Sequence, residues 1–273
     1  MYKFIVLVVV VLFLSSQTLC AQENSGTTAA EMPAEIMLLE QQAEAGDLAA
    51  KSELGFEYLF GGRVQQDVFK AERLLRDVAK SGDAAAQTAV AYIYEEGMGI
   101  VPNLDAAVKW YRQAVEQDHP VAQSRLGYIY KTHEGKYRDY TKAAELLERA
   151  ATWGDEYAQA NLADMYENGL GVKQDYKKAA TWYSAAASQN HLMAQWRIGY
   201  FHENGLGVEQ DYIKAHMWYS IAGVWDSLEG DRIPEGDPRY EIRKKMTPEQ
   251  ILEAETLAND WWSEHFTQEE GGF

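Results

Sequence analysis

The sequence predicts an all-α solenoid of five helix-turn-helix repeats, each 36 residues long, with a capping helix at either end. Three observations predict this fold class. The repeats follow one another without a gap, and within each of them apolar residues recur every three or four positions, the period of an amphipathic helix. A turn, rich in glycine in most repeats, interrupts that period. A repeat of this length is typical of stacked units that share one continuous core. The repeats span residues 47–82, 83–118, 119–154, 155–190 and 191–226.

The chain begins with an apolar run, Phe4 to Leu14, followed by small and polar residues, which predicts a signal peptide over residues 1–21. The run holds 11 residues, whereas crossing a bilayer takes roughly 20. We therefore expect cleavage before Gln22 and export to a periplasmic or extracellular compartment, with no direct membrane insertion of the mature chain. Lipid anchoring at Cys20 is disfavoured, because Leu19 occupies the preceding position, where lipidation requires a small residue.

Capping helices are expected on both sides of the array, because the terminal repeats would otherwise expose their apolar faces. The sequence T-P-E-Q after residue 246 supplies an N-cap threonine, a proline at the first helical position and a capping-box glutamine. The acidic stretch before it is rich in glycine and proline, which is typical of a loop. The flanking segments are a linker over 22–33, an N-terminal capping helix over 34–46, an acidic loop and short connector over 227–246, a C-terminal capping helix over 247–267 and a tail over 268–273.

Each repeat divides into helix A, a turn and helix B. In the fourth repeat the helical period runs through Leu162 and Tyr166, stops at Gly169 and Gly171, and resumes at Trp182. Glycines at these two positions suit a helix that ends in the left-handed conformation before a tight reversal. A Trp-Tyr pair recurs on helix B and is expected to pack between hairpins rather than to form a ligand site. The pairs are Trp110-Tyr111, Trp182-Tyr183 and Trp218-Tyr219.

The chain is strongly acidic, with 42 acidic and 25 basic residues and a formal net charge of −17. Nucleic acids and anionic membrane surfaces require basic patches, so neither is expected as a partner. Cys20 is the only cysteine and leaves with the signal peptide, so no disulfide or thiol chemistry is available to the mature chain. The histidines form no H-E-x-x-H motif, and no catalytic motif pairs a nucleophile with a base. We expect a protein that is not an enzyme and that binds no metal and no cofactor.

The repeated pattern resembles that of the Sel-one-like repeat (SLR) family, a relative of the tetratricopeptide repeat. The resemblance covers residues 47–226. It weakens where the first repeat has Arg63 for the second turn glycine and where the third has His133 for the first, and both of these repeats carry Leu-Leu in place of Trp-Tyr. The fourth repeat matches the family pattern at Ala158, Leu162, Tyr166, Gly169, Gly171, Val172, Asp175, Lys178, Ala179, Trp182, Tyr183, Ala185 and Ala186.

The resemblance implies a right-handed superhelix with the A helices on its concave side, and a role as a non-catalytic interaction scaffold. The lack of an N-x-[ST] sequon and of a terminal K-D-E-L favours a bacterial cell envelope. Two alternatives stay open. One is an envelope hydrolase, because cysteine-rich members of the family are linked to β-lactam binding or hydrolysis, although the S-x-x-K, S-D-N and K-T-G motifs are absent here. The other is a structural component of an envelope assembly.

The concave positions of helix A, taken by analogy with tetratricopeptide repeats, carry an aromatic ladder beside a mostly acidic row. Aromatic rings would anchor an extended peptide, and carboxylates would orient a basic or amphipathic one. The expected partner is therefore a protein or peptide, and the acidic row favours a basic one. The alternative is that the tyrosines are half-buried spacers and the acids are solvated. The expected partner-binding residues are Tyr92, Glu95, Tyr128, Asp164, Glu167, Trp196, Tyr200 and Glu203.

Overall fold

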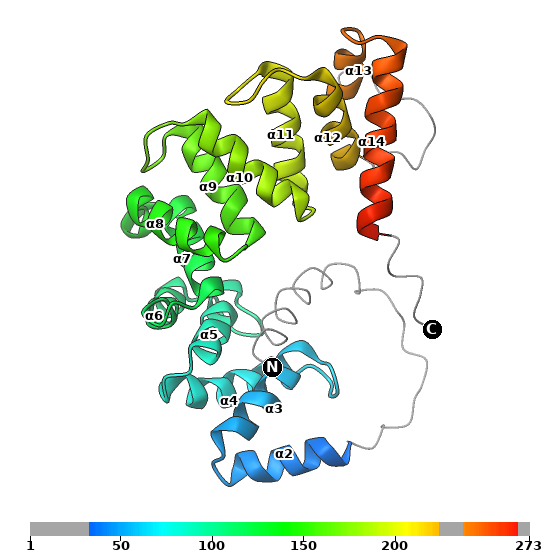
Figure 1. The fold of residues 1–273 in the computed structure, drawn as a ribbon. Coiled ribbons are helices and arrows are strands. Elements are labelled where there is room, and N and C mark those ends of the chain that lie inside the picture. The colour runs from blue at the N-terminus through cyan, green and yellow to red at the C-terminus, as the bar shows by residue number, and fades with distance from the viewer. Residues whose placement is uncertain (1–32, 224–236, 267–273) are drawn as a thin grey trace. The chain divides into compact units, whose positions relative to one another are not determined.

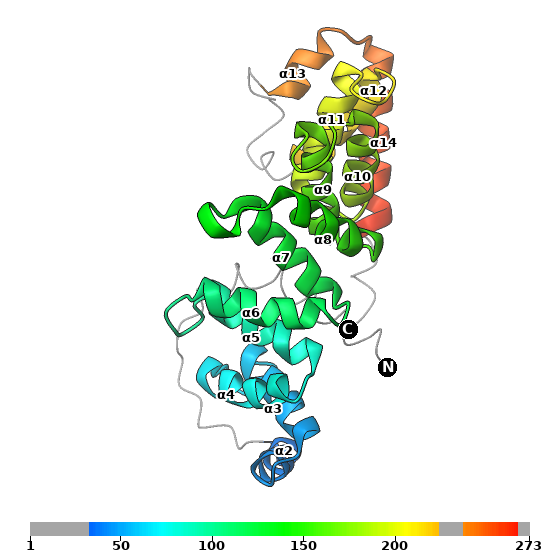
Figure 2. The ribbon, with the colours of Figure 1, turned by 90° about the vertical axis from the view of Figure 1, so that its left-hand side faces the viewer.

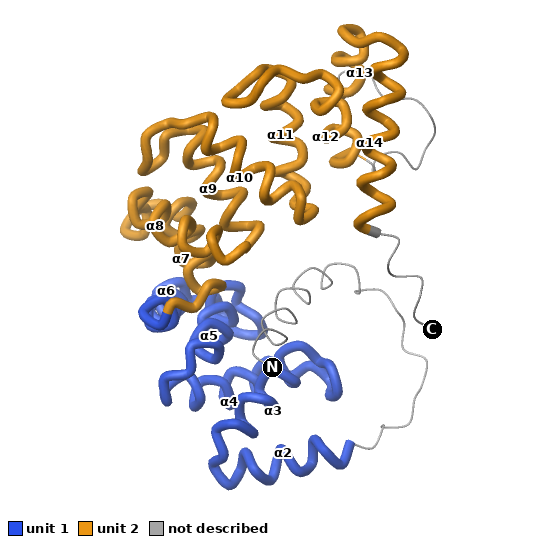
Figure 3. The backbone as a smooth tube through the Cα atoms, viewed as in Figure 1, with its two compact units in different colours: residues 1–117 blue, residues 118–273 orange. Residues whose placement is uncertain are grey.

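The structure of the protein, a computed structural model, describes residues 33–223 and 237–266. The predicted signal peptide, most of the linker, the first half of the acidic loop and connector, and the tail lie outside these residues. Every regular element within the described residues is a helix. The chain divides into two compact units, unit 1 over residues 1–117 and unit 2 over residues 118–273, which are described separately (Figure 3).

Unit 1 contains a single helix followed by two helical hairpins (Figure 1). Its helices are α2 (Ala34–Glu44), α3 (Leu48–Phe60), α4 (Val68–Lys80), α5 (Ala84–Glu96) and α6 (Leu104–Val115). Unit 2 contains three hairpins and two further helices (Figure 2). Its elements are α7 (Pro120–Thr132), the short 3-10 helix η1 (Gly135–Tyr137), α8 (Tyr140–Thr152), α9 (Glu156–Asn168), α10 (Tyr176–Ser188), α11 (Leu192–Asn204), α12 (Tyr212–Gly223), α13 (Pro238–Arg243) and α14 (Pro248–Phe266). The hairpins α3–α4, α5–α6, α7–α8, α9–α10 and α11–α12 confirm the predicted all-α repeat solenoid.

Repeated polar residues begin the helices, and repeated glycines end helix A. The carboxylates of Asp83 and Asp155 accept the N–H groups of Ala86 and Ala158 at 2.7 and 2.6 Å, which satisfies donors that a helix leaves free at its start. Helix A of four repeats ends at a glycine with φ between 65° and 73°, a conformation that disfavours other residues. In the third repeat His133 is extended instead (φ −79°, ψ 134°), and η1 follows it.

Each hairpin closes around small residues on helix A that face large ones on helix B. Gly127 lies against Leu147 and Gly199 against Tyr219, so closely that a Cβ atom on either glycine would overlap the facing side chain. The tyrosines of the three Trp-Tyr pairs are buried, as expected for a packing role. Their hydroxyl groups must therefore find acceptors inside the hairpins.

Buried glutamines on helix A connect the second, fourth and fifth hairpins to the helix before each of them. Their Nε2 atoms donate to the backbone carbonyl eight residues earlier, in the last turn of the preceding helix B. The donors are Gln87, Gln159 and Gln195, at 3.1, 3.2 and 3.3 Å. The Oε1 atoms of Gln87 and Gln159 accept from a second glutamine, Gln117 or Gln189, at 2.9 and 2.8 Å. Trp153 replaces that second glutamine in the third repeat, and the buried Oε1 of Gln123 has no hydrogen-bond partner within the described residues.

The second turn glycine is required by the neighbouring repeat. A Cβ atom on Gly171 would overlap the backbone carbonyl of Tyr140, and one on Gly207 would overlap that of Tyr176. Each of these turns therefore rests on the first residue of the preceding helix B, and a side chain there would push the two repeats apart.

Helix α2 covers the first hairpin. Its Ile36 is fully buried in the core that α3 shares, and Tyr58 of α3 donates to Glu40 of α2 at 2.7 Å. Arg63 stands where other repeats have the second turn glycine. Its guanidinium pairs with Glu53 and Glu57 of α3 at 2.7 and 2.9 Å, and with Glu35 of α2 at 3.4 Å, so Arg63 links α3 to α2.

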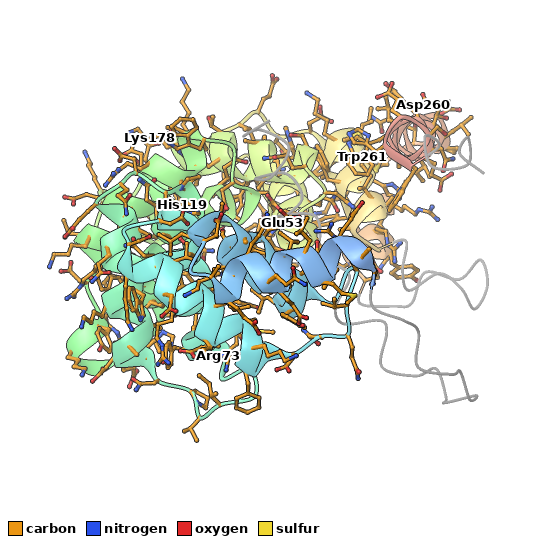
Figure 4. All side chains as sticks on the ribbon, turned by 90° about the horizontal axis from the view of Figure 1, so that it is seen from below. Glu53, Arg73, His119, Lys178, Asp260 and Trp261 are labelled. Atoms are coloured by element: carbon orange, nitrogen blue, oxygen red, sulfur yellow. The ribbon has the colours of Figure 1, made fainter. Side chains whose placement is uncertain are left out.

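Helix α14 packs along α12 (Figures 1 and 2). It begins with the predicted capping box, in which the N–H of Thr247 donates to Oε1 of Gln250 at 2.9 Å. Figure 4 shows Trp261 on the side of α14 toward α12, where its ring centroid lies 6.3 Å from that of Trp218. This aromatic contact covers the last hairpin.

Helix α13 lies within residues 227–246, which the composition predicts to be a loop and connector. Its Ile242 is fully buried against Ala215 and Tyr219 of α12. Next to it, Nε of Arg243 donates to Nε2 of His216 at 2.9 Å. Burial, aided by the charge of Arg243, lowers the pKa of His216 to about 4, so the imidazole is neutral and able to accept this bond. The apolar contact of Ile242 and the hydrogen bond from Arg243 to His216 thus dock α13 on α12.

The close approach at Gly171 predicts a large cost for a side chain at that position. In Gly171→Ala a side chain is held at a positive φ, which costs about 1–2 kcal/mol, and its Cβ atom overlaps the backbone of Tyr140. Together these two effects should lower the free energy of unfolding by about 3 kcal/mol. Gly135→Ala is the matched control, because its φ is also positive but a Cβ atom there meets nothing within 4 Å. Urea titrations followed by circular dichroism measure both variants. Equal losses would contradict the contact between repeats.

Candidate partner-binding surface

The A helices of unit 2, which are α7, α9 and α11, lie side by side and are joined by ion pairs. Lys131 of α7 pairs with Asp164 of α9 at 2.6 Å, and Arg197 of α11 pairs with Glu167 of α9. We call the surface at positions three, six, ten and thirteen of these helices the A-helix face of unit 2. Its larger side chains are Tyr128, Lys131, Tyr157, Asp164, Glu167, Met193, Trp196, Tyr200 and Glu203.

Large apolar and aromatic side chains are exposed on this face. The exposed fractions are 42% for Tyr128, 45% for Tyr157, 63% for Met193 and 38% for Trp196. Trp196 also stacks in parallel on Tyr200, one helical turn away, with ring centroids 6.1 Å apart. A group of exposed apolar side chains on one face is typical of an interaction surface.

The structure separates the predicted partner-binding residues into two sets. Tyr92 and Glu95 lie on α5 in unit 1, and the other six lie on the A-helix face of unit 2. In unit 1 the aromatic side chains at position ten are half-buried, and one of them, Phe56, stacks on Phe60 at 6.2 Å. In unit 2 position ten holds the exposed Tyr128, Asp164 and the half-buried Tyr200, so the exposed rings of the A-helix face are Tyr128, Tyr157 and Trp196 rather than a ladder at one position.

The acidic row has hydrogen-bond donors within the fold. In three repeats the buried tyrosine hydroxyl of helix B donates to the carboxylate at position thirteen of helix A. The pairs are Tyr111–Glu95, Tyr183–Glu167 and Tyr219–Glu203, at 2.6, 2.9 and 3.0 Å. Burial raises the pKa of both Tyr183 and Tyr219, so these phenols stay protonated and donate. Where helix B has leucine instead, in the first and third repeats, position thirteen is Leu59 or Lys131.

The remaining charges of the face also pair with one another. Lys131 replaces the usual glutamate at position thirteen, and Asp164 replaces the usual aromatic ring at position ten of the next repeat, so the two substitutions form one ion pair. Lys245, which follows α13, pairs with Glu203 at 3.4 Å. Charge on this face is therefore balanced locally.

Two exposed residues of the face, Tyr157 and Met193, are not among the partner-binding residues predicted from the sequence. Both occupy position three of helix A, where the earlier repeats have Ala49, Ala85 and Val121. That increase in size is visible in the sequence, but the exposure of the side chains depends on the neighbouring helix. The ring of Tyr157 lies edge-on to His191 at the start of α11, with centroids 5.2 Å apart.

No group of three or more His, Cys, Asp or Glu side chains among the described residues could hold a metal ion. None of the described helices is both long and apolar enough to cross a bilayer. A hollow of about 500 Å³ at the turn of the fourth repeat, lined by Tyr166, Val172 and Lys178 among others, lies away from the A-helix face.

Comparison with known proteins agrees with the repeat pattern. The family model for the Sel1 repeat matches residues 48–83, 84–119, 120–155, 156–191 and 192–223. One similar solved structure is a Sel1 repeat protein from Oxalobacter formigenes, with a TM-score of 0.60 and 25% identity, and the match covers 80% of this chain and 96% of that one. Another is a protective antigen of uropathogenic Escherichia coli that displays an SLR fold, with a TM-score of 0.57 and 28% identity. That match covers 84% of this chain but only 56% of the antigen's chain. No curated protein matches the sequence.

The contacts of Glu167 predict that its removal lowers stability. Glu167→Ala leaves the Tyr183 hydroxyl and the Arg197 guanidinium without their acceptor, so the free energy of unfolding should fall by about 2–3 kcal/mol. Glu209→Ala, at an exposed turn residue of the same unit, is the control and should change it by no more than about 0.5 kcal/mol. Urea denaturation compares the two. A neutral Glu167→Ala would mean that this carboxylate is free to serve a partner.

Proposed function

The chain belongs to the Sel1 repeat family, and we propose that it is an exported, non-catalytic scaffold that binds a protein or peptide through the A-helix face of unit 2. Proteins of this family are generally protein-interaction scaffolds and are mostly non-catalytic. The proposal assigns this general role to one surface of the present chain and to a cell envelope.

One observation carries the proposal, namely the exposed rings and apolar side chains that α7, α9 and α11 present together. Tyr128, Tyr157, Met193 and Trp196 remain open to solvent although each sits on a helix that packs against its neighbours on other faces. A partner that covers them removes apolar surface from water, and aromatic side chains dominate the energy of most interfaces. The ion pairs that join the three helices hold the surface in one arrangement, which reduces the entropy lost on binding.

The basic character of the partner, which the acidic row favours, stays a prediction. The acidic row supports a basic partner less strongly than the sequence suggests. Glu95, Glu167 and Glu203 each accept a tyrosine hydroxyl inside their own hairpin, so these carboxylates already have partners within the fold. The exposed side chains support a protein or peptide partner whatever its charge.

Removing rings from the face should weaken binding without unfolding the chain. Tyr128→Ala and Trp196→Ala are each expected to reduce capture of a cross-linked partner from cell-envelope extract by about tenfold or more, because exposed aromatic anchors are typical hot spots. Phe69→Ala is the matched control, since Phe69 is 66% exposed but lies on helix B of the first repeat, in unit 1. Cross-linking pull-downs quantified by mass spectrometry measure the change.

Circular dichroism of the same variants separates binding from folding. Loss of helical signal in Tyr128→Ala would show that the ring is a packing residue, as in the spacer alternative. Folded variants that still capture every protein captured by the parent chain would place the binding surface elsewhere.

Export is part of the proposal and rests on the N-terminal apolar run of the sequence. Expressed in a Gram-negative host with its full N-terminus, the protein should give a mature chain that begins at Gln22 and carries no lipid. Intact-mass measurement of the periplasmic fraction tests this. A diacylglyceryl group on Cys20, or a chain that retains Met1, would be the contrary result.

A further inference from the structure

We propose that the A-helix face of unit 2 binds an extended peptide segment whose contacting side chains are apolar and uncharged, and that opposite charge does not select the partner. This inference rests on the proposed function and specifies the chemistry of the partner. It is carried by two features of the face, which are its completed ion pairs and its open apolar surface.

The charged groups of the face already have partners within the fold. The ion pairs are Lys131–Asp164, Arg197–Glu167 and Lys245–Glu203. The side chains of Arg197 and Glu167 are only 23% and 13% exposed, and Glu167 also accepts the Tyr183 hydroxyl. A cationic side chain of a partner would have to displace these groups and lose its own hydration. A positive charge on the partner therefore adds little to the binding free energy.

The uncharged surface of the face is open by contrast. Tyr128 lies on α7, Tyr157 on α9, and Met193 and Trp196 on α11, with exposed fractions between 38% and 63%. An apolar side chain laid on these groups removes water from both surfaces and breaks no ion pair. A face with balanced charges and exposed rings thus complements a segment that carries no charge.

A segment of the polyproline II type suits such a surface. A polyproline II chain advances about 3.1 Å per residue with three residues per turn, which is about 9 Å per turn. Side chains at every third residue therefore lie on one side of the segment and can contact the exposed rings together. Such a segment is already extended, so it loses little entropy on binding.

Three synthetic peptides test the inference with the full mature chain. Each has about four copies of Leu-Pro-Pro, Lys-Pro-Pro or Glu-Pro-Pro, so the three share a backbone and differ in charge. Fluorescence anisotropy should give the leucine peptide a Kd at least about tenfold below that of either charged peptide. Raising the salt from about 50 to about 500 mM should change this Kd by less than about twofold.

Variants of the protein assign the binding to the face. Tyr157→Ser and Met193→Ser should each raise the Kd of the leucine peptide by about threefold or more, because each removes an exposed contact. Phe69→Ser is the control and should leave it unchanged, since Phe69 lies in unit 1.

Tighter binding of the lysine peptide, weakened by salt, would overturn the inference while the proposed function stood with a basic partner. Binding of none of the peptides at about 1 mM, a concentration that detects even weak complexes, would also overturn it. Capture of the cross-linked partner separates the two proposals. If capture still depends on Trp196, only the partner's chemistry is wrong, and if it does not, the proposed function fails as well.

Discussion

The hairpins of this chain bury polar groups and backbone that only a neighbouring repeat can satisfy, and this requirement orders the rest of the structure. Helix A glutamines reach back to carbonyl groups of the preceding helix B, and the second turn glycine rests on the first residue of that helix. Both contacts need a fixed spacing, which holds the repeat length constant. A second glutamine of the same repeat completes this arrangement, and where Trp153 replaces it, the buried Oε1 of Gln123 lacks a donor within the described residues.

Polar groups buried inside each hairpin decide what the A helices can offer to a partner. A buried tyrosine hydroxyl on helix B needs an acceptor, and the glutamate at position thirteen of helix A supplies it. A carboxylate that accepts this hydroxyl and is also ion-paired with Arg197 or Lys245 attracts a distant cation only weakly, because the paired charges cancel at a distance. The residues that remain available are the rings and the methionine whose side chains stay exposed to solvent.

Differences among the repeats place these available residues in unit 2. Small residues occupy positions three and six of helix A in the first two repeats. In the last two repeats Tyr157, Met193 and Trp196 occupy three of these four positions, and only Ala160 is small. Lys131 and Asp164 both depart from the repeat pattern and form an ion pair, so one departure is compensated by another in the next repeat. Specificity can therefore differ between repeats while the stack stays intact.

The sequence by itself determined the repeat length, the all-α fold, the turn glycines and the capping box at Thr247, because each depends on a period or on residues a few positions apart. It also placed six of the expected partner-binding residues on helices that prove to share one face. Only the tertiary structure decided that the glutamates accept tyrosine hydroxyls 16 residues away, that Tyr157 and Met193 stay exposed, and that α13 docks on α12. These outcomes depend on which side chains of separate helices meet in space, and a local pattern does not contain that information.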